Sequence, residues 1–162
     1  MNSKDTFIDW LRDAYAIEKA LVDTLRKHAA DAKEYPDIQK PIEDHLKVTE
    51  NHAEDIEALL EDLGADKSGL KTAMARFSGL VTGVPNSLSD DTLVKNALAE
   101  YASENLEIAC YTSLIAAAQE LGLEDAAATL ESILADEQEM ADFLIATIPE
   151  ITTGYLLETK NA

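Results

Sequence analysis

Two glutamates interrupt the apolar stripes of two long helical segments, and such positions suit metal chemistry. Glu18 falls at spacings of three and four within the stripe of residues 11–25, and Glu137 does so within residues 127–148. This periodicity places both carboxylates on the faces that should be buried. An ionised carboxylate in an apolar core is costly unless it is paired, hydrogen-bonded or bound to a metal. Inward carboxylates in a helical bundle therefore indicate a candidate metal site.

A third helical segment offers Glu104 and Glu107 near the same level as these two glutamates. Counted from the turns expected near residues 33 and 123, Glu18, Glu107 and Glu137 each lie roughly 15 residues away, and each residue rises ~1.5 Å. The carboxylates could thus share one layer. Because acidic residues are abundant, a hydrogen-bonded or stripe-edge glutamate is the alternative for any one of them.

The second helical segment is the weakest part of this pattern. At the required level it has Val48 and Thr49, with Glu50 and His52 next to them. Its apolar stripe directs both His45 and His52 inward. Neither the second nor the fourth segment contains the Glu-x-x-His motif of ferritin-like di-metal proteins. Glu50 and His52 are the candidate ligands here, although a lone inward histidine is more often a packed residue than a ligand.

Composition restricts the possible partners. The 162 residues include 32 acidic and 13 basic side chains, giving a net charge of -19, which disfavours nucleic acid and anionic membranes. A single cysteine, Cys110, excludes an internal disulfide. No signal-peptide core and no apolar run of ~18–20 residues is found. We expect a cytoplasmic protein without nucleic-acid or membrane partners.

The pattern predicts an all-α chain with helices over about 3–30, 37–63, 67–82, 90–121 and 124–148 and a tail over 149–162 that forms one more docked turn. Ser3 is the expected N-cap of the first helix, and Pro149 is expected to end the last one. Pro41 raises the alternative of a short opening turn separated from the main second helix. Two helical hairpins joined by a long crossover with a short extra helix predict one ferritin-like four-helix bundle over residues 1–162.

Several separated stretches resemble one bacterial family. Residues 9–14, Asp-Trp-Leu-Arg-Asp-Ala, followed by Glu18-Lys19, are similar to the start of the YciE/YciF family of ferritin-like proteins. Residues 107–114, residues 140–142, and His45-Leu46 followed by Thr49 resemble the same family, over nearly the whole chain. The resemblance implies a ferritin-like bundle with a crossover helix, a homodimer and a role in general stress responses.

The same resemblance implies which carboxylates matter. Of the family's carboxylates, the chain retains Glu18, Glu104, Glu107 and Glu137. It departs on the second helix, where family members commonly carry Glu at the positions of Lys47 or Val48, and Glu50 is the candidate replacement.

Two functions of different classes follow. The first is a metal-binding bundle that holds iron or manganese, with ligands drawn from Glu18, Glu50, His52, Glu104, Glu107 and Glu137. The alternative is a metal-free stress protein that acts by association with an unidentified protein partner, its carboxylates being remnants of an ancestral site. An iron store is a weaker third option, because storage requires a closed shell of many subunits.

Overall fold

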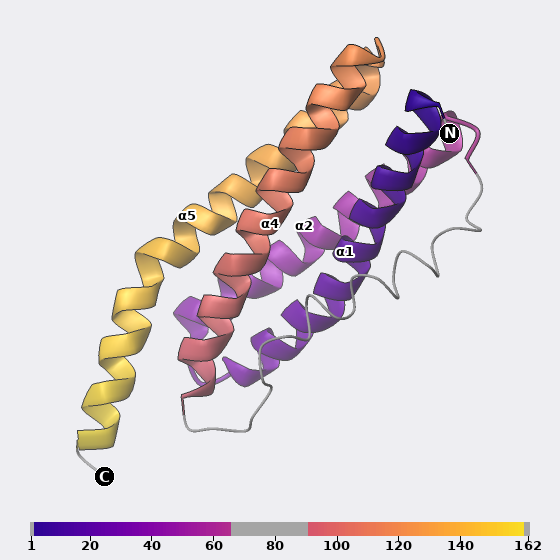
Figure 1. The fold of residues 1–162 in the computed structure, drawn as a ribbon. Helices are drawn as coiled ribbons and strands as arrows, with labels where there is room; N and C mark the ends of the chain where they lie inside the picture. The colour runs from indigo at the N-terminus through magenta and orange to yellow at the C-terminus, as the bar shows by residue number, and fades with distance from the viewer. Residues whose placement is uncertain (1, 66–90, 161–162) are drawn as a thin grey trace.

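The computed structural model describes residues 2–65 and 91–160, and these residues form four long helices (Figure 1). The helices are α1 (Ser3–Asp31), α2 (Pro36–Asp62), α4 (Thr92–Glu120) and α5 (Glu124–Lys160). No strand occurs within the described part of the chain. The helix expected over residues 67–82 lies outside the described residues.

The helices pair as two antiparallel hairpins, α1 with α2 and α4 with α5 (Figure 1). Each hairpin has a short turn, which makes its two helices neighbours. The end of α2 and the start of α4 lie at opposite ends of the bundle (Figure 1). The chain therefore has the ferritin-like four-helix topology that the sequence predicted.

The first helix begins at Ser3, but its N-cap is one residue earlier than expected. Asn2, and not Ser3, is the N-cap: its side-chain oxygen accepts a hydrogen bond from the Asp5 backbone N–H at 2.9 Å, and Asp5 Oδ2 accepts one from the Asn2 backbone N–H at 3.1 Å. This reciprocal pair is a capping box, which satisfies two otherwise unpaired donors. The prediction of Ser3 as the cap was wrong because Asp5 can return the hydrogen bond only to Asn2.

Two prolines lie inside helices, contrary to the expected breaks. Pro41 leaves α2 continuous from Pro36, so no opening turn is separated. Pro149 does not end α5, which continues to Lys160. An interior proline costs ~3 kcal/mol, and tertiary contacts offset this cost. Ile151 is buried beyond the proline, and the Tyr35 hydroxyl donates to Glu158 at 3.1 Å.

The buried interior has two apolar parts with a polar layer between them. One apolar part includes Phe7, Leu11 and Leu130, near the start of α1 and α5. The other includes Leu25, Ile42 and Leu144, toward the opposite end of the bundle. No helix among the described residues is long and apolar enough to cross a membrane.

Candidate metal centre

The polar layer gathers glutamate and histidine side chains from all four helices. The residues that could hold a metal ion there form what we call the glutamate–histidine centre; they are Glu18 on α1, His45 and His52 on α2, Glu104 on α4 and Glu137 on α5. All five are buried, and Glu18 and Glu137 have no exposed surface. Their helical positions explain the convergence, because each lies on the inward stripe of its own helix.

The first group consists of Glu18, His52 and Glu137. His52 Nδ1 lies 2.9 Å from Glu137 Oε1 and 3.9 Å from Glu18 Oε1. One ligand atom from each residue lies within 4.8 Å of the other two. Two ligands bound to one ion at ~2.1 Å lie at most ~4.2 Å apart, so only small side-chain shifts would bring all three onto one ion.

The second group consists of His45, Glu104 and Glu137. His45 Nε2 lies 3.4 Å from Glu104 Oε1 and 3.4 Å from Glu137 Oε2. This group also satisfies the 4.8 Å limit. Glu137 thus belongs to both groups, with Oε1 facing His52 and Oε2 facing His45. A carboxylate in this position can join two ions.

Several buried atoms of the centre have no hydrogen-bond partner. They include Glu18 Oε2, Glu104 Oε2 and Glu107 Oε1. Buried polar atoms in native proteins are nearly always satisfied, and exceptions require an explanation such as an ion. Carboxylate oxygens with imidazole nitrogens are a donor set that suits iron and manganese. The donor set and its unsatisfied atoms therefore fit a divalent metal.

Burial raises the pKa of three carboxyl groups in the metal-free centre. Burial, with repulsion from Glu137, raises the pKa of Glu18 to about 8. Burial also raises the pKa of Glu104 to about 7, although His45 opposes the shift. The pKa of Glu107 rises well above its ordinary value through burial and then through the charges of Glu18, Glu137 and Glu104. The centre is therefore short of positive charge.

The pKa shifts of the two histidines and of Glu137 favour the charged forms of these three groups. Burial lowers the pKa of His45, but Glu104 and Glu137 outweigh it and raise the pKa to about 10. Burial also lowers the pKa of His52. Its acidic neighbours Glu137, Glu18 and Asp136 outweigh burial and raise this pKa to about 9. Burial acts against ionisation of Glu137, yet the two histidines lower its pKa to about 2. Without metal, protons on the histidines take the place of cations.

Neighbouring side chains hold the ligands in place. The Tyr111 hydroxyl donates a hydrogen bond to Glu18 Oε1 inside the core. His52 Nε2 lies 3.1 Å from Asp136 Oδ2, which leaves Nδ1 directed at the centre. Such outer contacts fix the orientation and tautomer of a ligating imidazole. Thr49 donates to the backbone oxygen of His45 at 3.1 Å and is not available as a strong ligand.

Four of the six candidate ligands converge as the sequence suggested, namely Glu18, His52, Glu104 and Glu137. Glu107 is buried beside them but belongs to neither three-residue group. Glu50 is exposed and accepts a hydrogen bond from Arg26 at 3.1 Å, so the structure places it outside the centre. His45 takes the second-helix position instead. Its inward direction was predicted, but its place among the candidate ligands was missed.

The ferritin-like motif survives only in part. On α2, Thr49 and His52 have the Glu-x-x-His spacing with Thr in place of Glu; on α5, Glu137 and Met140 have it with Met in place of His. His45 lies one helical turn before Thr49 and supplies the imidazole that Met140 does not. The centre therefore has two histidines, but both come from α2.

Comparison with known proteins places this bundle among its relatives. The family model described as "Domain of unknown function (DUF892)" matches residues 2–157. A crystal structure of a protein from Xanthomonas campestris is similar with a TM-score of 0.81 and 28% identity, covering 99% of each chain. The E. coli stress protein YciF is similar with a TM-score of 0.76 and 26% identity, covering 94% of this chain and 98% of that one.

A third solved structure, YcfI from Rhodopseudomonas palustris, is similar with a TM-score of 0.71 and 24% identity, covering 89% of this chain and 93% of that one, and supports the fold alone. The family match covers almost the whole chain, and the YciF likeness agrees with the resemblance found in the sequence. The chain therefore belongs to the DUF892 family, the YciE/YciF family of ferritin-like helical-bundle proteins.

Proposed function

We propose that this protein is a stress-response bundle that binds two iron or manganese ions in the glutamate–histidine centre. One observation carries the proposal: Glu137 Oε1 lies 2.9 Å from His52 Nδ1 while Glu137 Oε2 lies 3.4 Å from His45 Nε2. One carboxylate thus has an oxygen in each of two potential ligand groups. Such shared carboxylates are expected in di-metal centres of helical bundles.

Charge balance supports two divalent ions. Glu18, Glu104, Glu107 and Glu137 would carry four negative charges when ionised, and two divalent cations would neutralise them with both histidines uncharged. Glu107 interacts most strongly with Glu18 among its charged neighbours, so we assign it to the ion of the first group. Each ion would then have one carboxylate from α4, with Glu137 shared between the ions.

The metal ions would supply reactivity toward oxygen or peroxide. The chain would hold the ligands in position and keep bulk water away from them. Tyr111 holds Glu18, Asp136 orients His52, and the two apolar clusters exclude bulk water from the layer between them. A stress role follows from family membership, since the related YciF is described as a stress protein.

The proposal is tested by elemental analysis of untagged protein purified without chelator. We expect iron or manganese at one or two ions per chain, and loss of this metal in the Glu18→Ala/Glu137→Ala double variant. Metal retained by the double variant would contradict the assigned ligands. No metal in either protein, even after anaerobic loading with ferrous iron, would favour the metal-free alternative.

Thermal denaturation is a second way to distinguish the metal-binding function from the metal-free alternative. A ligand that binds only the folded state stabilises it by ~2.7 kcal/mol at a hundred times its Kd. We therefore expect a chelator to lower the Tm of the metal-loaded wild type and added metal to restore it. A Tm unchanged by chelator in protein shown to contain metal would place that metal outside the folded centre.

A further inference from the structure

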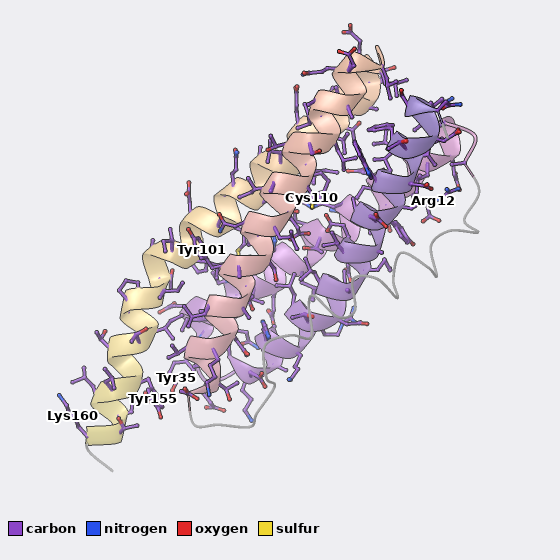
Figure 2. All side chains as sticks on the ribbon, in the orientation of Figure 1. Arg12, Tyr35, Tyr101, Cys110, Tyr155 and Lys160 are labelled. Atoms are coloured by element: carbon purple, nitrogen blue, oxygen red, sulfur yellow. The ribbon has the colours of Figure 1, made fainter. Side chains whose placement is uncertain are left out.

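An open pocket lies at the end of the bundle where α1 ends and α4 begins. Its volume is about 740 Å³, and its wall comprises the α1–α2 turn with the start of α2, the start of α4 and the second half of α5. Tyr35 and Tyr155, which both line it, are labelled at this end in Figure 2. Its described lining has no basic residue and five acidic ones, which are Glu34, Asp37, Asp91, Glu150 and Glu158. We call it the acidic pocket.

Part of this charge is already compensated. Lys95 pairs with Asp91 at 2.9 Å, and Lys33 approaches Glu34 at 3.8 Å. Glu158 accepts hydrogen bonds from Tyr35. A concave wall with carboxylates of one sign focuses the field and concentrates cations. The pocket thus favours entry of positive ions at this end.

A small enclosed cavity continues the acidic pocket toward the interior. The two share five lining residues, which are Ile38, Leu93, Phe143, Thr147 and Ile151. The cavity measures about 10 Å³, which is close to the room that one water molecule needs. The polar side chains of His28, Asn96 and Glu100 also line it, together with three apolar residues, Ile42, Ala97 and Leu144. A single small ligand could therefore stand between the acidic pocket and these three side chains.

His28 and Glu100 form a buried pair that the glutamate–histidine centre does not use. They are 5% and 3% exposed, and His28 Nδ1 is hydrogen-bonded to Glu100 Oε1. The second carboxylate oxygen, Glu100 Oε2, is buried without a hydrogen-bond partner. Next to the pair, Asn96 Nδ2 donates to Asp31 Oδ2 at 3.0 Å. An unsatisfied oxygen at the cavity wall is a suitable temporary ligand for a cation.

The inward face of α4 connects this pair to the centre. Asn96, Glu100 and Glu104 follow one another at intervals of four residues and are 9%, 3% and 2% exposed. Residues four apart lie on one helix face and rise ~6 Å per step. Glu104 belongs to the second ligand group. A ladder of buried oxygen ligands therefore runs from the small cavity to the centre.

We propose that divalent cations reach the centre from the acidic pocket, with Glu100 and His28 as an intermediate binding position. The inference rests on the proposed metal function and adds the route by which a fully buried site is loaded. Another opening, of about 300 Å³ between α1 and α4, is a poorer entrance. The described residues of its wall include Trp10, Ile17 and Leu114 and only one acidic residue, Asp13.

The test compares the rate of loading with the final amount of metal bound. Metal-free protein is mixed with Co²⁺, uptake is followed by visible absorption, and the stoichiometry is measured by elemental analysis. Glu100→Gln keeps the shape and a hydrogen-bonding partner for His28 but removes the charge. We expect uptake to slow by about tenfold with the final stoichiometry unchanged. Glu120→Gln, an exposed change on the same helix, should load like wild type.

The entrance is tested independently of Glu100. Asp37→Asn/Glu150→Gln/Glu158→Gln removes three charges from the acidic pocket, and we expect slower uptake that depends less on salt. The matched control, Glu120→Gln/Glu124→Gln/Asp125→Asn, removes three charges from exposed positions at the opposite end. Circular dichroism verifies that each variant is folded. If Glu100→Gln does not fold, the two triple variants alone test the route.

The outcomes separate this route from the function on which it rests. Wild-type protein that takes up no Co²⁺ contradicts the proposed metal centre and the route with it. Wild-type protein that binds Co²⁺ while Glu100→Gln and the acidic-pocket variant load at its rate contradicts the route alone. Slow loading by the opposite-end control as well would mean that net charge, and not this entrance, governs uptake.

Discussion

The Nδ1 atom of His52 lies 2.9 Å from Oε1 of Glu137, and both side chains are buried in the polar layer. With the pKa of His52 raised to about 9 by its acidic neighbours, the two groups form a buried ion pair in the metal-free centre. A metal ion would replace the proton of His52, since a deprotonated imidazole nitrogen and a carboxylate oxygen can each offer a lone pair. This is the shortest distance between a histidine nitrogen and a carboxylate oxygen within the glutamate–histidine centre.

The pH dependence of metal binding follows from the protons that the metal-free centre holds. His45 and His52 have pKa values raised to about 10 and about 9, and burial raises the pKa of Glu18 to about 8. Their contribution to metal-free stability is fully present below the unfolded pKa values and is lost as pH rises through the folded ones. A metal must displace these same protons.

We therefore expect a fixed concentration of Mn²⁺ to raise the Tm more at pH 8 than at pH 6. The metal-free protein should itself lose stability between about pH 5, where Glu18 starts to contribute, and about pH 10, the raised pKa of His45. Thermal melts with and without Mn²⁺ at both pH values measure the difference. A gain that is equal at the two pH values, or larger at pH 6, would show that these protons are not displaced.

Tyr111 should contribute to stability through its hydroxyl. The ring is 1% exposed and the hydroxyl donates to Glu18 Oε1. Tyr111→Phe leaves that oxygen buried without a partner, which should lower the free energy of unfolding by ~1–2 kcal/mol in metal-free protein. Urea denaturation measures it. Tyr101→Phe, at a half-buried ring on the same helix, is the control, and equal losses in both variants would disprove the role of this hydrogen bond.

The part of α5 beyond Pro149 should be held by packing. Ile151 is 8% exposed there, whereas Ile145 on the same helix is 48% exposed. Truncating a buried isoleucine to alanine costs ~2 kcal/mol or more, and an exposed one costs less than ~0.5 kcal/mol. Denaturant unfolding of Ile151→Ala and Ile145→Ala compares them. Similar small effects would mean that this segment does not support the bundle.

Much of the fold could be predicted from the sequence because apolar periodicity fixes both the length and the inward face of each helix. Glu18 and Glu137 were found for the same reason, since apolar neighbours one turn away on both sides place them inside. The end of α5 could not be predicted locally, because the burial of Ile151 beyond Pro149 depends on residues far away in the sequence. Local propensity gives no information on such contacts.

The ligand set was harder to predict than the helices. Successive residues are ~100° apart around a helix. A difference of one position between Glu50 and its neighbours in the sequence therefore decides whether a side chain faces solvent or the core. The structure places Glu50 on the exposed side and His45 in the core. On α4 the buried face itself has Glu100, Glu104 and Glu107, so the contrast between polar and apolar faces is weak. Pairing of Glu100 with His28 depends on α1 and gives no signal in either helix alone.

The most direct measurement is the metal content of Glu137→Gln beside that of Glu139→Gln, because Glu139 is an exposed glutamate two residues away. His45→Asn and His52→Asn complete the set. After loading with Mn²⁺, elemental analysis should give two ions per chain for wild type and Glu139→Gln, one for each histidine variant, and close to none for Glu137→Gln. Wild-type metal content in Glu137→Gln would contradict a shared carboxylate at the centre.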